Sequence, residues 1–396
     1  MNFKTLILFT NSYPYGNGEQ YLENEFPHYS NDFKRIIFVP VKLIGEKRAI
    51  PNNAEDLDIH SKVNYSKSKY ISLFPKFNSS FKHEKKLRNK IGGTKKQHYK
   101  LFYNASVYAE AIDKWLEEQN IDRNLTVFYS YWFYHWVTVM SELRNLNNYG
   151  RYISRAHLYD TYDYLEYNYW GGKKLFSLDK LICISDHSKK YFNDNYSQNL
   201  DKIQTQRLGV ANQELSLLRE RKNEFTLISC SSIRTDKRLD FILEVLKNLS
   251  LKIKWIHFGD GPLKADIENR IKNLPENVEA ELKGFIPNSE LLNYYKNNQI
   301  DLFINLSSRE GIPVSLMEAI SFGIPVLGTN VFGTPELVSN KTGILVDLDD
   351  SAQAVAEKIT NHLNTVIRRK EIRKFQQEYF SAEKNYSEFR KILLNE

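Results

Sequence analysis

The sequence predicts an α/β protein with two Rossmann-like domains. Apolar runs with the length of buried strands alternate with helical segments along the chain, an order typical of parallel sheets with crossover helices. At 396 residues the chain is long enough for roughly two to three domains that each bury a core. A charged stretch at 218–224 separates two series of such segments. We therefore expect a domain at 1–206, a linker at 207–224 and a second domain at 225–375.

Both series can be followed element by element. In the first, strands are expected at 5–10, 35–40, 126–130, 151–154 and 181–184, with helices near 106–119, 137–146 and 187–195. In the second, strands are expected at 226–230, 254–258, 278–283, 301–305, 325–328 and 343–346, with helices at 239–249 and 290–297. The final segment, 376–396, is amphipathic at helical spacing, with one apolar face made of Phe380, Tyr386, Phe389 and Leu393.

The composition is that of an ordinary globular protein. Hydrophobic residues make up 41% and charged residues 26%, and no apolar run approaches the ~18 residues of a transmembrane helix. The N-terminus, MNFKTLILFTNSYPYG, lacks the small residues of a signal-peptide cleavage site, so it reads as a first strand. Cys183 and Cys230 both lie in predicted strands and give no disulfide framework, so we expect buried thiols and a cytoplasmic protein.

Positive charge is concentrated at residues 62–100. The whole chain carries a net charge of +7, and this stretch holds twelve Lys and Arg against one acidic residue, Glu84. Aromatic residues are interleaved with the basic ones: Tyr65, Tyr70, Phe74, Phe77, Phe81, Tyr99 and Phe102. Such a surface fits the anionic inner face of a membrane. The alternative is a solvated loop and helix. Nucleic acid would also attract the charge, but no nucleic-acid-binding module is present in the sequence.

Residues 301–338 contain the most informative pattern. A buried strand is followed by Glu310-Gly311-Ile312-Pro313, then by a helix that holds Glu318. Pro313 suits the first position of that helix, because its missing N–H is unsatisfied there in any residue. The free N–H groups and the helix dipole favour a phosphate at this end, and two glutamates can accept hydrogen bonds from hydroxyls. The pattern suits a ligand with a diphosphate and sugar diols.

The spacing of this segment resembles a family signature. The pattern is E-G-x-P, four residues, E-A, three residues and G-x-P-V, formed here by Glu310, Gly311, Pro313, Glu318, Ala319, Gly323, Pro325 and Val326. It resembles the donor site of retaining GT-B glycosyltransferases, the group 1 family that includes sucrose synthases and bacterial polysaccharide enzymes. The resemblance implies two Rossmann-like domains that face each other across a cleft, with a C-terminal helix, 376–396, that crosses back to the N-terminal domain.

The resemblance also implies cations on the donor diphosphate. Family members place an Arg just after the first strand of the second domain and a Lys five residues later. Lys237 matches the Lys, whereas Ser232 stands where the Arg is expected. Arg238 or Arg234 could supply the second cation. The alternative for these residues is an exposed basic turn.

Several other donor-side residues follow from position. Gly259 and Gly261 lie in a turn where a backbone can approach a ligand closely, and Phe285 is expected either against the base or in the core. Gly16 and Gly18 lie between the first strand and the first helix, where the resemblance implies a turn whose N–H groups face donor phosphate and acceptor.

His157 is the remaining candidate. The resemblance places a histidine close to the donor sugar, where an imidazole can hydrogen-bond a hydroxyl, and Asp160 could assist it. Without the resemblance, a lone histidine is more often structural. The aromatic run 128–137 could form a stacking platform for an acceptor, although such clusters are more often core.

The resemblance thus implies transfer of a sugar from a nucleotide diphosphate, with UDP favoured over GDP, to a hydroxyl of a glycan or lipid-linked saccharide in capsule or O-antigen assembly, with retention of configuration. His157, Glu310 and Lys237 are the expected catalytic residues. Expected donor-binding residues are Gly18, Arg238, Gly259, Gly261, Phe285, Gly311, Ile312, Pro313 and Glu318. No cofactor or metal is expected, and Asp347-Leu348-Asp349 reads as a turn rather than a metal site.

Two alternatives remain open. A sugar-nucleotide epimerase can share this two-domain fold, but it would lack the two-glutamate signature. A non-catalytic partner subunit would keep the fold, and Ser232 favours it, whereas Glu310, Glu318 and Lys237 oppose it.

Overall fold

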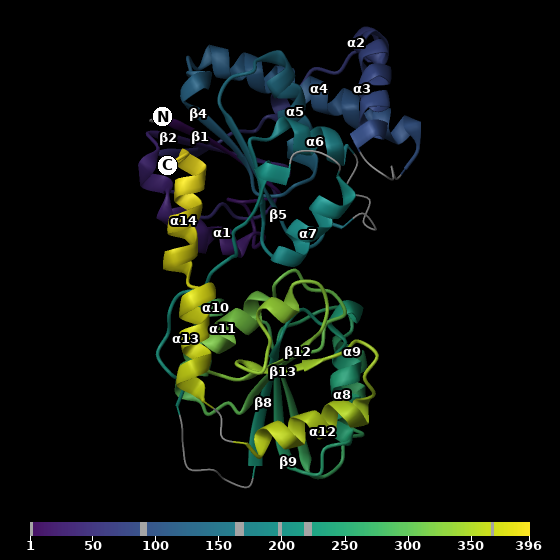
Figure 1. Ribbon diagram of the computed structural model, residues 1–396, viewed down its shortest axis with the longest axis vertical. Helices are drawn as coiled ribbons and strands as arrows, with labels where there is room; N and C mark the ends of the chain where they lie inside the picture. Colours follow the sequence, from purple (N-terminus) through teal and green to yellow (C-terminus); the bar gives the residue numbers. More distant parts are fainter. Residues whose placement is uncertain (1–2, 88–92, 163–169, 197–199, 218–223, 366–367) are drawn as a thin grey trace. The chain divides into compact units, whose positions relative to one another are not determined.

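The computed structural model describes residues 3–87, 93–162, 170–196, 200–217, 224–365 and 368–396. The chain forms two compact units, one made of Met1–Gln206 with Tyr386–Glu396 and the other of Arg207–Asn385. Each unit is a parallel α/β sheet with helices on both faces (Figure 1). The predicted fold class is therefore confirmed.

The first unit is built on a seven-stranded sheet in the order β3-β2-β1-β4-β5-β6-β7. Its strands are β1 Thr5–Thr10, β2 Arg35–Pro40, β3 Ala54–Asp56, β4 Thr126–Ser130, β5 Arg151–Ala156, β6 Lys180–Cys183 and β7 Ile203–Thr205. Along β1, Leu6 and Leu8 pack into one core cluster while Ile7 and Phe9 pack into the other. The run is continuously apolar because both faces of the sheet are covered. The five predicted strands are confirmed, and β3 and β7 were not predicted because three-residue strands leave little pattern.

The helices of the first unit include an extended helical layer. They are α1 Gln20–Glu25, α2 Lys67–Ser72, α3 Phe74–Leu87, α4 Lys95–Glu118, α5 His135–Leu146, α6 Gly171–Ser177 and α7 Asp186–Asn195. Helix α4 begins well before the predicted start at 106. Thr94 and Gln97 form a capping box there, in which Gln97 N donates to Thr94 Oγ1 at 3.2 Å and Thr94 N donates to Gln97 Oε1 at 2.7 Å.

The second unit has a six-stranded sheet in the order β10-β9-β8-β11-β12-β13. Its elements are β8 Glu224–Cys230, α8 Leu239–Lys247, β9 Lys252–Phe258, α9 Lys264–Ile271, β10 Val278–Gly284, α10 Asn288–Asn297, β11 Leu302–Asn305, α11 Val314–Ser321, β12 Val326–Thr329, β13 Gly343–Val346, α12 Ala352–Leu363, α13 Arg369–Tyr379 and α14 Ala382–Leu394, of which α14 runs into the first unit. The six predicted strands are confirmed to within two residues at each end.

In both sheets the strand order reverses beside the first strand of the unit, between β1 and β4 and between β8 and β11. This is the classic Rossmann order in each case. In open parallel sheets the loops that follow the strands at such a switch point form the ligand-binding crevice. Ligand-binding residues are therefore expected in the turns after β1 and β4 and in the turns after β8 and β11.

The C-terminal segment differs from the single helix predicted at 376–396. It forms two helices, because Val210 inserts between them: Val210 N donates to Phe380 O at 2.9 Å, and Ala382 N donates to Val210 O at 3.0 Å. Phe380 lies in the second unit, whereas Phe389 and Leu393 pack into the core of the first. The four predicted apolar residues are buried, but they do not share one helical face. Of the stretch predicted as a linker, 207–217 belongs to the second unit.

Candidate active site

The turn after β11 carries the two-glutamate pattern. Pro313 was predicted at the first helical position, and this is wrong by one residue. Its extended backbone, with φ −72° and ψ 112°, makes it the N-cap of α11. Its carbonyl accepts from Leu316 N at 3.1 Å and Met317 N at 3.2 Å, so α11 begins at Val314. The first N–H groups of α11 have no partner within the helix, which keeps this end suited to an anion.

Glu310 and Lys237 meet at the switch point. Lys237 Nζ lies 2.6 Å from Glu310 Oε1, and both side chains are mostly buried, at 17% and 14% exposure. Asn305 Nδ2 donates to the same oxygen at 3.2 Å. Lys237 ends the short helix Thr235–Lys237 after β8, so residues 73 positions apart are joined by the sheet order. The pair places one cation and one carboxylate together where the turns after β8 and β11 meet.

Glu318 lies on α11 and is nearly buried, at 9% exposure. Asn288 Nδ2, at the start of α10, donates to Glu318 Oε1 at 2.8 Å. Burial raises the pKa of Glu318 to about 7, although the hydrogen bond from Asn288 opposes the rise. Asn288 was not singled out in the sequence, and its only signal is a polar residue directly after the Pro287 helix cap. Phe285, in the same loop, is 66% exposed, so the core alternative for it is wrong.

The two glycines of the turn after β9 lie close to the backbone of the turn after β8. A Cβ at Gly259 would lie 1.9 Å from Ser231 O, and one at Gly261 would lie 2.5 Å from Ile233 O. Ile233 N also donates to Asp260 O at 2.9 Å. The glycines therefore allow the turns after β8 and β9 to pack against each other, so the close approach is to protein backbone.

A buried chain of hydrogen bonds fixes the turn after β8. Trp255 Nε1 donates to Ser229 Oγ at 3.0 Å, Ser229 Oγ donates to His257 Nδ1 at 2.8 Å, and His257 Nε2 donates to Ser231 O at 3.1 Å. Burial lowers the pKa of His257 to about 4, which keeps the ring neutral in this tautomer. The chain holds the backbone that presents Ser232. Sequence reasoning missed it because its members come from two strands.

Neither arginine predicted as the second cation is held toward Glu310 by a described contact. The Arg238 guanidinium lies over the Phe241 ring at 4.2 Å, and burial lowers its pKa. Arg234 Nη2 pairs with Asp236 at 3.2 Å.

In the first unit, Glu19 occupies the turn after β1. Its carboxylate accepts from the backbone N–H groups of Asn11, Ser12 and Tyr13 at 2.8, 2.8 and 2.7 Å. Trp132 Nε1, after β4, donates to it at 2.7 Å. Glu19 has a left-handed backbone, with φ 57°. Four N–H groups on one carboxylate lock this loop.

The glycine turn was predicted to offer its N–H groups to a ligand, and the contacts differ. Gly16 N donates to Glu46 O at 2.9 Å. A Cβ at Gly18 would lie 2.5 Å from Ser12 Oγ, a contact that rotation of the Ser12 hydroxyl can relieve. The backbone amides nearest the strand end are those bound to Glu19.

His157 lies after β5 and faces the residues after β4. Nε2 donates to Tyr131 O at 3.1 Å, so Nδ1 carries the lone pair, and the ring lies 4.4 Å from that of Trp132. Burial, followed by the charge of Arg155, lowers the pKa of His157 to about 3. The ring is neutral and can accept a hydroxyl hydrogen bond. Asp160 accepts from Phe133 N at 2.7 Å and from His157 N, so its carboxylate holds the backbone of the loop that carries His157.

The aromatic run after β4 is mainly core. Phe128, Tyr129, Tyr131, Phe133 and Trp136 are at most 4% exposed. Trp132 is partly exposed and links Glu19 to His157. The core alternative therefore holds for most of the run.

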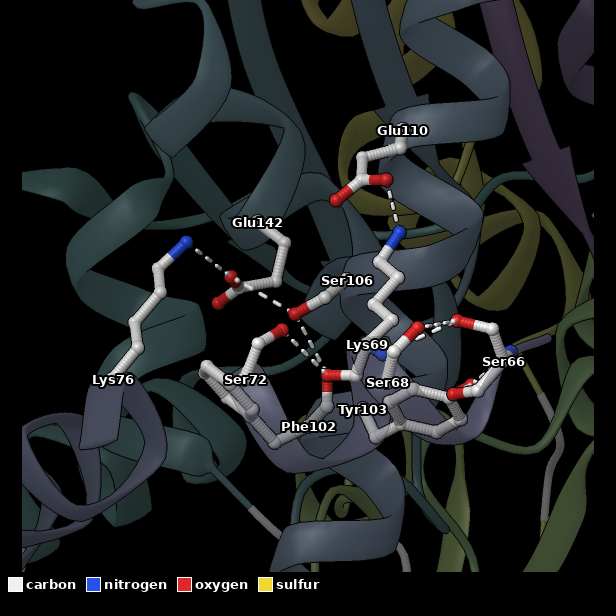
Figure 2. A network of polar contacts seen from close by, with 10 residues as sticks. All are labelled: Ser66, Ser68, Lys69, Ser72, Lys76, Phe102, Tyr103, Ser106, Glu110 and Glu142. Atoms are coloured by element: carbon white, nitrogen blue, oxygen red, sulfur yellow. Dashed lines mark hydrogen bonds and ion pairs between the residues drawn. The ribbon is translucent and has the colours of Figure 1, made fainter. Parts of the chain in front are cut away.

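The basic stretch is a helical layer with a buried aromatic centre. Phe77, Phe81, Tyr99 and Phe102 pack with Trp170, so the prediction of an aromatic surface is wrong for these four. Figure 2 shows how the layer is anchored: Lys69 of α2 reaches Glu110 of α4, and Lys76 of α3 lies 3.4 Å from buried Glu142 of α5. Glu84 caps α6, accepting from Gly172 N at 2.9 Å and Lys173 N at 2.7 Å. Arg88 and Lys90 lie outside the described residues.

Four aromatic or aliphatic side chains of this layer are exposed, and we call this group the corner of the helical layer. Tyr65, Tyr70, Ile71 and Phe74 are 53%, 39%, 71% and 47% exposed. Exposed lysines surround them in the sequence: Lys62, Lys67, Lys76, Lys82, Lys85, Lys86, Lys95 and Lys96.

Asp347 lies in a turn after β13, where Asp347 N donates to Asp350 Oδ2 at 3.0 Å. Within the described ranges, no three His, Cys, Asp or Glu side chains are grouped to hold a metal ion. In the same part of the chain, no helix combines the length and the apolar character that a bilayer crossing requires.

The fold and the switch-point residues define a double Rossmann α/β protein with a candidate nucleotide-sugar site. Residues 214–379 match the family described as Glycosyl transferases group 1.

Several proteins to which this chain is similar in sequence or in fold are named as glycosyltransferases. The chain is 28% identical over 165 residues to the amylovoran biosynthesis glycosyltransferase AmsK of Erwinia amylovora, covering 39% of this chain and 40% of AmsK. It is 29% identical over 186 residues to the putative colanic acid biosynthesis glycosyltransferase WcaL of Escherichia coli K12, covering 43% and 46%. The matched segments thus span less than half of these relatives. The fold is similar to the lipopolysaccharide outer core galactosyltransferase WaaB, with TM-score 0.71, 13% identity and 99% coverage of both chains. It is also similar to pneumococcal GtfA in complex with UDP and GlcNAc, with TM-score 0.68, 13% identity and coverage of 100% and 99%.

Proposed function

We propose that the protein is a retaining glycosyltransferase that moves a sugar from a nucleotide diphosphate sugar to a hydroxyl of a glycan or lipid-linked acceptor. The observation that carries the proposal is the Lys237–Glu310 pair at the β8/β11 switch point, beside α11 and the nearly buried Glu318. The relatives AmsK and WcaL, named for amylovoran and colanic acid biosynthesis, support a role in cell-surface polysaccharide assembly. UDP in the GtfA complex supports a UDP-sugar donor.

In this proposal Glu318 accepts hydrogen bonds from the ribose hydroxyls. Glu310 and the backbone at 311–313 hold the transferred sugar. Lys237 and the amino end of α11 stabilise the diphosphate as negative charge develops on it. The bond from the anomeric carbon to the phosphate oxygen breaks, the acceptor oxygen bonds to that carbon on the same face, and the departing phosphate oxygen takes the acceptor proton.

In this proposal Lys237 exchanges its partner Glu310 for the diphosphate of the donor. In the structure Lys237 is paired with Glu310 at 2.6 Å. A diphosphate brings more negative charge than one carboxylate, so Lys237 can turn to it while Glu310 is released to accept sugar hydroxyls. One cation together with a helix end supplies positive charge to the leaving group, and this supports turnover without a bound metal.

The test is nucleotide release from UDP-, GDP-, ADP- and TDP-sugars by purified protein, with and without EDTA. We expect slow release from one donor, faster with an acceptor extract, and equal rates with EDTA. Arrest by EDTA would refute metal independence alone. If no sugar nucleotide is turned over and no free nucleotide raises the melting temperature, the non-catalytic partner suggested by Ser232 becomes the better explanation.

We also propose that the corner of the helical layer binds an anionic membrane surface on the cytoplasmic side. Ile71 and Phe74 are exposed next to the α2–α3 junction, with Lys67 and Lys76 flanking them. Apolar side chains can enter the headgroup region while lysines meet anionic lipid. Ile71→Ser/Phe74→Ser should reduce co-sedimentation with phosphatidylglycerol vesicles, and Ile44→Ser, at a 74% exposed site elsewhere in the unit, should not. Equal binding by both variants would refute the proposal.

A further inference from the structure

The nearly buried Glu318 has a neighbour that the sequence pattern did not include. Helix α10 turns one face toward the core, with Asn288, Leu291 and Tyr295 at i, i+3 and i+7. Leu291 and Tyr295 are buried at 4% and 0% exposure. Asn288, one end of this face, is exposed and reaches Glu318 Oε1 at 2.8 Å.

The two residues lie at different depths. Glu318 is 9% exposed, whereas Asn288 lies at the rim, directly after the loop with exposed Phe285. A glutamate side chain with three rotatable bonds loses entropy when it is held in one rotamer. The hydrogen bond from Asn288 orders the Glu318 carboxylate before a ligand binds. The loss of side-chain entropy therefore does not reduce the affinity for the ligand.

The direction of the hydrogen bond also matters. Asn288 donates, so it stabilises the ionised form of a carboxylate that burial would otherwise keep protonated. Oε1 is engaged by Asn288, which leaves Oε2 as the oxygen with full accepting capacity. An ionised, fixed oxygen is the form that accepts hydrogen bonds from vicinal hydroxyls most strongly.

We propose that Asn288 is a positioning residue that makes the site selective for ribonucleotides over 2′-deoxyribonucleotides, by holding the Glu318 carboxylate so that Oε2 receives the ribose hydroxyls. This inference rests on the proposed function, in which Glu318 binds the ribose. It adds a residue from α10 to a site otherwise formed by α11 and the turns after β8 and β11.

The test is binding of UDP, GDP and ADP and of their 2′-deoxy counterparts to the full chain, measured by calorimetry without any acceptor. For the nucleotide that binds best, wild-type protein should prefer the ribo form by about tenfold or more, the size of a hydrogen bond to a charged group. Asn288→Ala should reduce this ratio toward one while leaving the affinity for the deoxy form within about twofold. The matched control is Asn293→Ala, an exposed residue on the same helix that pairs with Asn297.

A second variant distinguishes the effect of the Asn288 hydrogen bond from the effect of the size of its side chain. Asn288→Asp has nearly the same shape but places a carboxylate against Glu318, so it should lose the preference for the ribo form at pH 7. In a buffer without Mg²⁺, raising the ionic strength should restore part of this preference, because salt screens the repulsion between the two carboxylates. Because Asn288 is itself exposed, both variants should remain folded at 25 °C, and their melting temperatures are measured beside that of the control.

Each outcome bears on one claim. If wild-type protein prefers the ribo form, Glu318→Gln loses the preference and Asn288→Ala keeps it, the inference about Asn288 is overturned and the proposed function stands. If wild-type protein and Glu318→Gln bind both forms equally, or no nucleotide binds, the ribose assignment fails and the inference fails with it. Loss of the preference in both Asn288→Ala and Glu318→Gln, but not in Asn293→Ala, supports it.

Discussion

Replacement of Lys237 by Ala should abolish most turnover while the protein remains folded. In the unliganded structure Lys237 Nζ lies 2.6 Å from Glu310 Oε1. In the proposed site the same ammonium contacts the leaving diphosphate of the donor. The variant therefore removes a contact that strengthens as the bond to the sugar breaks.

The expected magnitudes come from burial and charge. Loss of one preorganised donor to a developing anion lowers kcat by about 100- to 1000-fold. The folded state also loses a hydrogen bond between charged groups, worth about 1.5–3 kcal/mol when it is shielded from water, and the side chains here are only 17% and 14% exposed. For a unit of this size each kcal/mol shifts the melting temperature by about 2–4 °C, so the variant should melt a few degrees lower and be fully folded at 25 °C.

The assay is donor hydrolysis or transfer at saturating sugar nucleotide, with melting followed by calorimetry. Lys247→Ala is the matched control, because Lys247 pairs with Glu244 at 2.9 Å on the exposed side of α8. It should keep wild-type turnover. If Lys237→Ala is folded and turns over as fast as Lys247→Ala, Lys237 does not stabilise the leaving group and the site assignment is refuted.

Three further predictions follow from ionisation and burial. Because the folded pKa of Glu318 is raised to about 7 and ribose stabilises its ionised form, nucleotide affinity should rise from pH 6 to 8 with proton release, and calorimetry should find no such rise in Glu318→Gln. Arg155→Met leaves the fully buried Glu25 without its partner at 3.0 Å, so denaturant unfolding should show a loss of about 3–5 kcal/mol, largely recovered in Glu25→Gln/Arg155→Met. Since the pKa of His157 is lowered to about 3, His157→Asn should reduce turnover without changing the shape of the pH profile between 5 and 8; a lost acidic limb would contradict this.

The strands could be predicted because their patterns are local. The centre of β1, for example, is apolar at four consecutive positions, since Leu6 and Leu8 face one cluster and Ile7 and Phe9 the other. The start of α4 could not be predicted from apolar spacing, because its first turns are lysine-rich and depend on the Thr94 cap. The break before α14 was also missed, because it is made by Val210, far away in the sequence.

The residues of the candidate site also fall into those that a local pattern predicts and those that depend on distant partners. Glu310, Pro313 and Glu318 lie within nine residues, so their spacing on one turn and helix is written in the sequence itself. Glu19, Asn288 and His257 act through partners on other elements, at Trp132, Glu318 and Ser231. No local pattern marks such pairs, because hydrogen bonds across a sheet depend on which strands are neighbours.

By itself the sequence therefore determined the alternation of strands and helices, the donor-side turn and the match of residues 214–379 to the group 1 glycosyltransferases. Only the tertiary structure decided that Lys237 meets Glu310, that the carboxylate of Glu19 fills the turn after β1, and that four of the predicted surface aromatics form a core. The physical reason is the distance along the chain over which each kind of interaction acts. Backbone pattern and helix capping act over a few residues, whereas burial, pKa and hydrogen-bond partners are set by whatever the folded chain brings within a few ångströms.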